Sequence, residues 1–239
     1  MDPLEAHLQR QIEHSRDFFW HRIRWKAVSG QLRERRFELT DVGAGIGLVG
    51  EYLARQHPES TYHFVEPLPS LVAELESRFG PQANANQAKS YAGSRYVTLL
   101  DVLEHIEDDR AFLGDLVAKM EPGATLILTV PALQRLWSPW DVALGHFRRY
   151  DKASIVRVFA GLPVELREVS YLFPEMLPAA VARRRLRPAG AGAQAAQSAE
   201  FPDLSPTVNR LLYAVGSATL RLRRLWPTGT SVLAIADRV

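Results

Sequence analysis

The sequence predicts an α/β domain built on a mainly parallel β-sheet, and three observations support this prediction. A short apolar run ends at Asp41, and glycines then fall at positions 43, 45, 47 and 50 before helical spacing resumes. Other apolar runs of strand length alternate with helical segments along the chain. The chain has 239 residues, enough for one such domain with additions. A glycine-rich turn between strand and helix is where parallel sheets hold nucleotide-like cofactors.

The expected strands and helices follow from apolar runs and their stop signals. Strands are expected at residues 37–42, 61–66, 83–88, 96–101, 125–130, 164–171 and 231–237. Helices are expected within 1–36, where Leu4, Leu8 and Ile12 form a stripe, and at 47–56, 67–79, 109–120, 151–159, 176–186 and 206–226. Gly80 and Pro81 end the third helix, and Asp151 is a good N-cap. The strand at 83–88 is the hardest to read, because residues 82–94 are polar.

A long insertion separates the last two expected strands. Residues 172–230 hold a helix that ends in the basic run Arg183 to Arg187, then a low-complexity stretch, then a helix from Pro206 to Trp226. The second helix has arginines in its last turn, where the dipole favours cations, and one apolar face, made by Val208, Leu211, Leu212, Val215, Leu222 and Leu225. The whole insertion is roughly sixty residues long, which is far outside ordinary loop lengths. We expect a lid, a dimer surface or an element on an anionic membrane, with ordinary packing as the simplest alternative.

Composition excludes several classes of protein. Apolar residues make up 46% and charged residues 23%, as in an ordinary globular protein, and the formal charge of +2 is too small to predict a nucleic-acid partner. The chain has no cysteine, so it has neither disulfides nor thiolate metal sites. The polar start is unlike a signal peptide, and no apolar run approaches the ~18 residues of a membrane span. We therefore expect a cytoplasmic protein, with the inner face of the membrane as the alternative.

Two cofactor classes compete for the glycine-rich turn. Gly45 to Gly50 fits the dinucleotide pattern G-x-G-x-x-G, and Glu66 lies about 20 residues beyond it, where a ribose-binding acid is expected. The overlapping stretch Asp41 to Gly47 resembles the first motif of class I S-adenosylmethionine (SAM) methyltransferases. Glu66 suits either cofactor, because both present a ribose diol to a carboxylate. The turn alone leaves the choice open.

Three later motifs favour the methyltransferases. Tyr96 to Asp109, which contains Asp-Val-Leu-Glu-His, resembles their fourth-strand motif, and Pro122 to Pro131 is similar to their fifth strand. Leu136 to Tyr150, which ends in Leu-Gly-His-Phe-Arg-Arg-Tyr, resembles the substrate-side loop of one broad group of small-molecule methyltransferases. The dinucleotide interpretation explains only the first motif and Glu66.

This resemblance implies a Rossmann-like sheet of seven mainly parallel strands, with N-terminal helices and a helical insertion before the last strand. It divides the chain into a helical cover (1–36), a SAM-binding domain (37–171), the insertion (172–230) and the last strand (231–239). The implied reaction moves a methyl group from the sulfonium to O, N or C of a small or lipid-like acceptor. Such a direct displacement needs no metal, since alignment alone can supply about 7–11 kcal/mol of the barrier. The alternatives are an NAD(P)-dependent oxidoreductase and a non-catalytic methyltransferase-like binding protein.

The resemblance also implies cofactor contacts at the glycine-rich turn and at the next strand. The backbone of the turn is expected against the methionyl part of SAM, at Gly43, Ala44, Gly45 and Gly47. Glu66 is expected to accept hydrogen bonds from both ribose hydroxyls. Asp41 is expected near the cofactor amino group, with a structural turn residue as the alternative.

Further cofactor contacts are expected outside the turn. Asp101 and Val102 would line the pocket beyond the fourth expected strand. The family's usual adenine-binding acid is not visible, and Gln87 is the substitute. Arg24, close to Trp20 in the helix before the first strand, would hold the SAM carboxylate as a charge-assisted pair. An equal alternative is that Trp20 only packs in the core and that Arg24 lies on a solvated helix face.

Acceptor chemistry is expected between residues 137 and 150, because aromatic and charged side chains concentrate there between a strand and a helix. His146 is the first candidate for a general base and His105 the second, with a structural histidine as the alternative. Substrate contacts are expected from Trp137, Trp140, Asp141, Arg148, Arg149 and Tyr150. The arginines suit an anionic group, although one of them would alternatively pair with Asp141, and packing is the alternative for the tryptophans.

Overall fold

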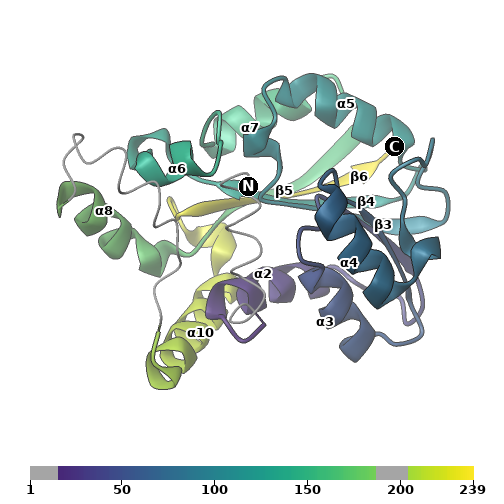
Figure 1. Cartoon of the computed structure of the whole chain (residues 1–239). Coiled ribbons are helices and arrows are strands. Elements are labelled where there is room, and N and C mark those ends of the chain that lie inside the picture. Colours follow the sequence, from purple (N-terminus) through teal and green to yellow (C-terminus); the bar gives the residue numbers. More distant parts are fainter. Residues whose placement is uncertain (1–15, 187–203) are drawn as a thin grey trace.

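The computed structural model describes residues 16–186 and 204–239, which form one sheet with helices on both faces (Figure 1). Two sequence predictions lie outside the described residues: the stripe Leu4, Leu8 and Ile12, and the low-complexity stretch 188–197. The side chains of the basic run 183–187 lie outside them as well.

The sheet has six strands in the order β2-β1-β3-β4-β6-β5. Their bounds are β1 Glu38–Val42, β2 Thr61–Val65, β3 Ser94–Leu100, β4 Thr125–Pro131, β5 Val164–Leu172 and β6 Ser231–Arg238. The strands β2, β1, β3 and β4 pair in parallel, and β6 pairs antiparallel with both β4 and β5. The last strand in the sequence therefore lies inside the sheet.

The prediction of a seventh strand at residues 83–88 is wrong. The chain instead forms a short 3-10 helix, η1 Pro81–Ala83, and makes a single bridge between Asn84 and Phe64 of β2. Asparagine side chains take the hydrogen bonds that a strand ladder would use: the Glu66 amide donates to Asn86, and the Asn86 amide donates to Asn84. Such local side-chain hydrogen bonds compete with regular backbone pairing.

The helices form two layers over the sheet (Figure 1). One face carries α2 Phe19–Ser29, α3 Leu48–Gln56 and α10 Pro206–Arg221, and the other carries α5 Asp109–Lys119 and α7 Lys152–Phe159. Alternate residues of β4 point to the two cores, with Leu126 and Leu128 on the α5 side and Ile127 on the α2 side. The helix α4 Pro69–Phe79 packs on the edge strand β2 through Leu75 and Phe64.

The insertion between β5 and β6 contains η4 Pro174–Met176, α8 Leu177–Leu186, α10 and η5 Arg223–Leu225. The helix α10 lies close to α2: a Cβ added to Gly216 would come within 2.1 Å of Ile23. Asn209 of α10 also accepts a hydrogen bond from the Phe19 amide at the start of α2, at 2.8 Å. These contacts attach the insertion to the α2 face.

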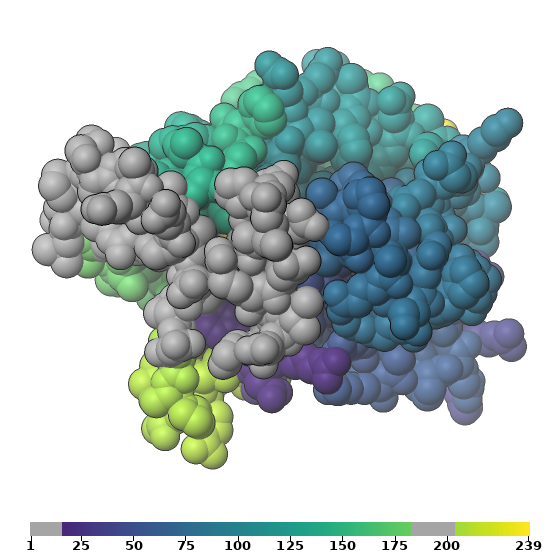
Figure 2. All heavy atoms as spheres, viewed as in Figure 1, coloured from purple at the N-terminus to yellow at the C-terminus, as the bar shows by residue number. Residues whose placement is uncertain are grey.

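The apolar face expected on α10 is largely exposed, and α10 projects from the body of the molecule (Figure 2). Leu211 is 62% exposed and Leu225, in η5, is 76% exposed. The arginines after α10 are not simply solvated, because Arg223 and Arg224 both pair with the buried Glu168 of β5. Among the described residues, no helix combines the length and the apolar character that crossing a membrane requires.

Candidate active site

The polar residues predicted for function gather at one edge of the sheet. The parallel strands β1, β2, β3 and β4 all end there, so the turns that follow them meet in space. The residues that follow these strands are Gly43 after β1, Glu66 after β2, Asp101 after β3, and the loop 132–150 after β4. Gly43, Glu66 and Asp101 belong to the expected cofactor half of the site, and the loop 132–150 holds the expected acceptor half.

The glycine-rich turn needs glycine for two different reasons. Gly43 has φ +72°, and a Cβ there would lie 2.4 Å from Val102, so the turn after β1 packs directly on the segment after β3. Gly47 has φ +76° and precedes the first residue of α3, and its Cβ would lie 2.6 Å from Leu75 of α4. Both positions are in the left-handed region that side chains disfavour. Gly43 thus shapes the crevice, whereas Gly47 brings two helices together.

Glu66 is joined to the glycine-rich turn by a hydrogen bond. Its carboxylate accepts from the Gly45 amide at 2.8 Å and from the Leu68 amide at 3.0 Å. Burial raises the pKa of Glu66, while the two backbone N–H groups act in the opposite direction. Two of about four acceptor positions of the carboxylate are therefore used.

Asp41 is buried within the sheet rather than at its surface. Its two carboxylate oxygens accept from Thr98 at 2.7 Å and from Tyr62 at 3.1 Å. Burial raises its pKa to about 6, against the opposing effect of these hydrogen bonds and of Arg24. This arrangement ties β1 to its two neighbours, and the predicted contact with the cofactor amino group stays a prediction.

Three other predicted cofactor residues have partners within the protein. Arg24 of α2 forms an ion pair with Asp101, and Thr129 also donates to Asp101, at 3.0 Å. The buried Nε of Arg24 has no hydrogen-bond partner among the described residues. Trp20 stacks on Phe173 with ring centroids 3.8 Å apart. Trp20 thus has a packing role, its predicted cofactor contact stays a prediction, and Arg24 keeps one unused donor.

Gln87 is exposed on the loop that follows η1. Its neighbour Asn86 lies closer to the cofactor half, because Asn86 accepts the hydrogen bond from the Glu66 amide at 2.9 Å. The adenine contact predicted for Gln87 stays a prediction.

The loop 132–150 is organised around Asp141, whose side chain is fully buried. Asp141 lies in the short helix α6 Pro139–Ala143 and forms two hydrogen bonds with Arg149, at 2.6 and 3.0 Å. It also accepts from Ser138 and is 3.0 Å from Nδ1 of His146. Burial opposes its ionisation, but the hydrogen bonds from His146 and Arg149 keep its pKa below the ordinary value.

Arg148 and Tyr150 are both anchored to Asp109. Arg148 pairs with Asp109 at 2.8 Å and donates to the Glu107 carbonyl. Tyr150 is 2% exposed and donates to Asp109 at 2.8 Å. Burial and the neighbouring Asp109 raise the Tyr150 pKa. In this structure both side chains hold the loop to the start of α5. Trp137, just before α6, and Trp140, within α6, are half-buried.

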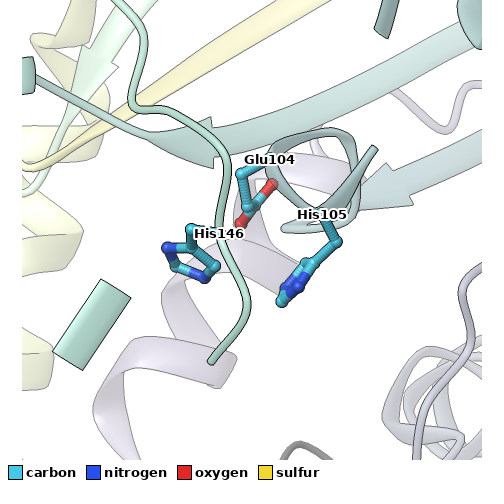
Figure 3. Close-up of side chains that lie close together, drawn as sticks. All are labelled: Glu104, His105 and His146. Carbon is cyan, nitrogen blue, oxygen red and sulfur yellow. The ribbon is translucent and has the colours of Figure 1, made fainter. Parts of the chain in front are cut away.

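Glu104, His105 and His146 come together where the β3 and β4 segments meet (Figure 3). Glu104 and His105 belong to η2 Leu103–His105, and His146 comes from the loop after α6. The amide of Phe147 donates to the Glu104 carbonyl at 2.7 Å, which fixes the two segments together. The imidazole rings of His105 and His146 meet edge to face, with centroids 4.7 Å apart.

Glu104 was not among the residues predicted for the site. It is 1% exposed, and its Oε2 atom has no hydrogen-bond partner among the described residues. Burial and the negative charge of Asp101 raise its pKa well above the ordinary value. Its place beside His105 in Asp-Val-Leu-Glu-His is the one sequence signal, and that signal does not reveal the approach of His146.

Comparison with known proteins identifies relatives. Residues 4–166 match the family model described as a methyltransferase domain. The chain is 31% identical over 101 residues to the mitochondrial ubiquinone biosynthesis O-methyltransferase of Schizosaccharomyces pombe, covering 38% of this chain and 37% of that protein. It is 30% identical over 115 residues to the ubiquinone biosynthesis O-methyltransferase of Xanthomonas axonopodis pv. citri, covering 45% and 48%. The matches thus span less than half of the length of either curated relative.

A solved structure shares the fold across nearly the whole chain. A chain from the complex between the Haloferax volcanii Trm112 methyltransferase activator and a methyltransferase superposes with a TM-score of 0.65. The superposition covers 99% of this chain and 96% of that one, at 14% sequence identity. At that identity the likeness concerns the fold alone.

Proposed function

The chain belongs to the methyltransferase-domain family and is a SAM-dependent methyltransferase, and from this premise we propose that it methylates a hydroxyl oxygen of a small or lipid-like acceptor. Family membership favours this activity over the NAD(P)-dependent alternative. The observation that carries the choice of acceptor is the pair formed by His146 and Asp141 beside Glu104.

The His146–Asp141 pair has the features of a general base. Asp141 accepts at Nδ1 of His146, which leaves Nε2 as the proton acceptor. Asp141 is itself held by Arg149, so the imidazole has a fixed orientation and a nearby negative charge. A hydroxyl needs such a base, because its oxygen becomes a good nucleophile only as the proton leaves.

The reaction then balances in one step. The hydroxyl oxygen forms a bond with the methyl carbon as the carbon–sulfur bond breaks, and the electron pair of that bond stays on sulfur. The hydroxyl proton moves to Nε2 of His146, where Asp141 stabilises the imidazolium. The products are the methyl ether and S-adenosylhomocysteine.

The cofactor half of the site suits SAM. Gly43, Ala44, Gly45 and Gly47 would present backbone to its methionyl part, and Glu66 has unused acceptor positions for the ribose diol. The unpartnered Nε of Arg24 would donate to the cofactor carboxylate. Asp101 and Val102 would line the space between the two halves, since Val102 touches Gly43.

The names of the curated relatives support an oxygen acceptor. Both relatives are O-methyltransferases of ubiquinone biosynthesis, although the matches cover less than half of each. Trp137 before α6 and Trp140 within it would offer apolar surface to the body of such an acceptor. A membrane or dimer role for the insertion that contains α10 stays a prediction.

The test is a comparison of His146→Ala with the wild-type protein. Labelled SAM is incubated with host extract, the lipid and aqueous fractions are separated, and the labelled product is identified. With that acceptor, we expect His146→Ala to lower turnover by about 10²–10⁴-fold, the usual contribution of a general base. Binding of S-adenosylhomocysteine, measured by thermal shift, should be unchanged, because His146 lies in the acceptor half.

A matched control removes a histidine elsewhere. His63→Asn changes a histidine on the edge strand β2, where its ring contacts Glu38, and should keep full turnover. Equal turnover in His146→Ala and the wild type would reject His146 as the base. Label on a nitrogen or carbon atom of the product would reject the hydroxyl acceptor.

A further inference from the structure

The cluster of Glu104, His105 and His146 has the composition of a metal site. Each side chain offers one ligand atom, and these three atoms lie within 4.8 Å of one another. Figure 3 shows the two imidazoles on either side of the Glu104 carboxyl group, around one shared space. The direct displacement predicted from the sequence does not need a metal, so a cation here is an additional property of this chain.

Within the described chain, the unpartnered oxygen of Glu104 is a free acceptor that faces this space. Glu104 is 1% exposed, and within residues 16–186 and 204–239 nothing donates a hydrogen bond to its Oε2. Leaving a buried carboxyl oxygen without a partner is unfavourable, because the group has lost its water. A cation between the carboxylate and two imidazole nitrogens would remove that penalty. Burial disfavours an isolated carboxylate charge here, but it strengthens the attraction between a carboxylate and a bound cation.

The surroundings of His146 are those of a metal-binding histidine. Asp141 lies 3.0 Å from Nδ1, so Nδ1 carries the proton and Nε2 carries the lone pair that a metal needs. Metal-bound histidines commonly donate their second nitrogen to a carboxylate in this way. Arg149 and Ser138 hold Asp141, and the hydrogen bond from Phe147 to the Glu104 carbonyl fixes the spacing of the ligand segments.

The nearby charges also favour a cation. Asp101 is the negative neighbour of Glu104, and the cations on this side are occupied: Arg24 pairs with Asp101, and Arg149 pairs with Asp141. A divalent ion would therefore lie beside Glu104, while Arg24 and Arg149 face the carboxylates of Asp101 and Asp141. Electrostatic repulsion from these arginines is reduced accordingly.

We propose that Glu104, His105 and His146 bind one divalent first-row transition cation, such as Zn²⁺, Mn²⁺ or Fe²⁺, with an open position for the acceptor hydroxyl. Two imidazole nitrogens and one carboxylate suit these ions, whereas Mg²⁺ and Ca²⁺ prefer oxygen ligands. Three protein ligands leave at least one coordination position free, as in catalytic metal sites.

The binding itself does not depend on the proposed function, whereas the role in catalysis rests on the proposed methyl transfer to a hydroxyl group and would replace that of His146 as the base in that step. A hydroxyl bound to the cation has a lowered pKa, so its proton leaves to solvent water. The oxygen then forms the bond with the methyl carbon, and sulfur keeps the electrons of the bond that breaks. In this form Nε2 of His146 is a ligand, and the cation rather than His146 makes the oxygen reactive.

The experiment measures cation binding directly on the full chain. Protein stripped with a chelator is titrated with ZnCl₂, MnCl₂ or MgCl₂ in a calorimeter, and Mn²⁺ binding is followed by electron paramagnetic resonance. We expect one Zn²⁺ or Mn²⁺ per chain and much weaker binding of Mg²⁺. Glu104→Gln and His146→Ala should each lose the cation, whereas Asp141→Asn should weaken binding by about 10–100-fold, as second-shell changes do.

Two controls separate cation binding from folding and from the methyl transfer. His63→Asn removes a histidine without touching the cluster and should bind the cation like the wild type. A thermal shift with S-adenosylhomocysteine in each variant verifies that the cofactor half is folded. Absence of a one-to-one cation in the wild type, or binding that survives both Glu104→Gln and His146→Ala, overturns the metal site. If methyl transfer then persists in chelator, the proposed function stands without a metal.

Discussion

The carboxylates in the cofactor half of the site and those in the acceptor half are held in opposite ways. Glu66 accepts from two backbone N–H groups, and Asp41 accepts from two neutral hydroxyl groups. In the acceptor half, Asp141 is held by Arg149 and His146, and Oε2 of Glu104 lacks a partner within the described part of the chain. The first half is built from backbone and neutral donors, and the second from charges.

This difference teaches where each half obtains its stability. Neutral donors around Glu66 and Asp41 satisfy the carboxyl groups whether or not a ligand is present, so the cofactor half is formed in advance. The acceptor half depends on a buried ion pair between Asp141 and Arg149, and such pairs are costly to break. Changes at the charged half should therefore have the larger effect on stability.

Replacing Asp141 should have the largest effect. Asp141→Ala leaves Arg149, whose side chain is 14% exposed, as a buried charge without its partner. We expect the free energy of unfolding to fall by about 3–5 kcal/mol, the typical result of removing one member of a buried pair. Urea unfolding measures it. Glu59→Ala, which removes an exposed pair with Arg35, is the control and should change little. Equal losses in the two variants would contradict the comparison.

Replacing Asp41 tests the cofactor half through pH. Burial raises the pKa of Asp41 from 3.8 to about 6, so the folded state binds this proton more tightly than the unfolded state. Stability is therefore favoured below pH 4 and falls as pH rises through 6, by about 3 kcal/mol for a shift of ~2 units. Asp41→Asn cannot lose a proton, so it should lack this decline.

The measurement is urea unfolding of Asp41→Asn and wild type at pH 4.5 and pH 7.5. The stability of the variant relative to the wild type should increase between the two values, and cofactor affinity should fall if Asp41 faces the amino group. A difference that is the same at both pH values would show that Asp41 is ionised throughout, and would remove the argument for a raised pKa.

Replacing Glu66 should have the smallest of the three effects, and only when the cofactor is present. S-Adenosylhomocysteine at 100 times its dissociation constant should stabilise the wild type by about 2.7 kcal/mol. Glu66→Ala should remove most of that gain without unfolding the protein. Thermal shift measures both quantities, and Glu59→Ala again serves as control. A full shift in Glu66→Ala would exclude Glu66 from the ribose site.

The cofactor half could be predicted from the sequence because its parts are local. The strand expected at 37–42 is β1 Glu38–Val42, and Glu66 follows β2 as expected. Outside this half, Asp151 also caps α7 as expected, since it accepts from the Ser154 amide. In each case the signal and its structural effect lie within a few residues, so a short pattern is sufficient. Their contacts with the cofactor stay predictions.

The acceptor half was less predictable because distant segments build it. Asp141 had been expected at the substrate, but it is fully buried between His146 and Arg149, the pairing considered as the alternative for one arginine. Glu104 became a site residue only through the approach of His146. In the sequence, α5, β4 and α6 separate the two residues. Spacing along the chain does not encode such a meeting. The prediction of a strand at 83–88 was wrong for a different reason. Hydrogen bonds to asparagine side chains replace the backbone pairing that a strand would make.

The position of β6 inside the sheet has a consequence for biosynthesis. The edge strand β5 has β6 as its strand partner, and residues 173–230 are translated between them. At a translation rate of 5–20 residues per second, a ribosome needs about 3–12 s to supply that partner. During this interval the two β edges that β6 later pairs, one on β4 and one on β5, are still open, and neighbouring polypeptides are able to join them.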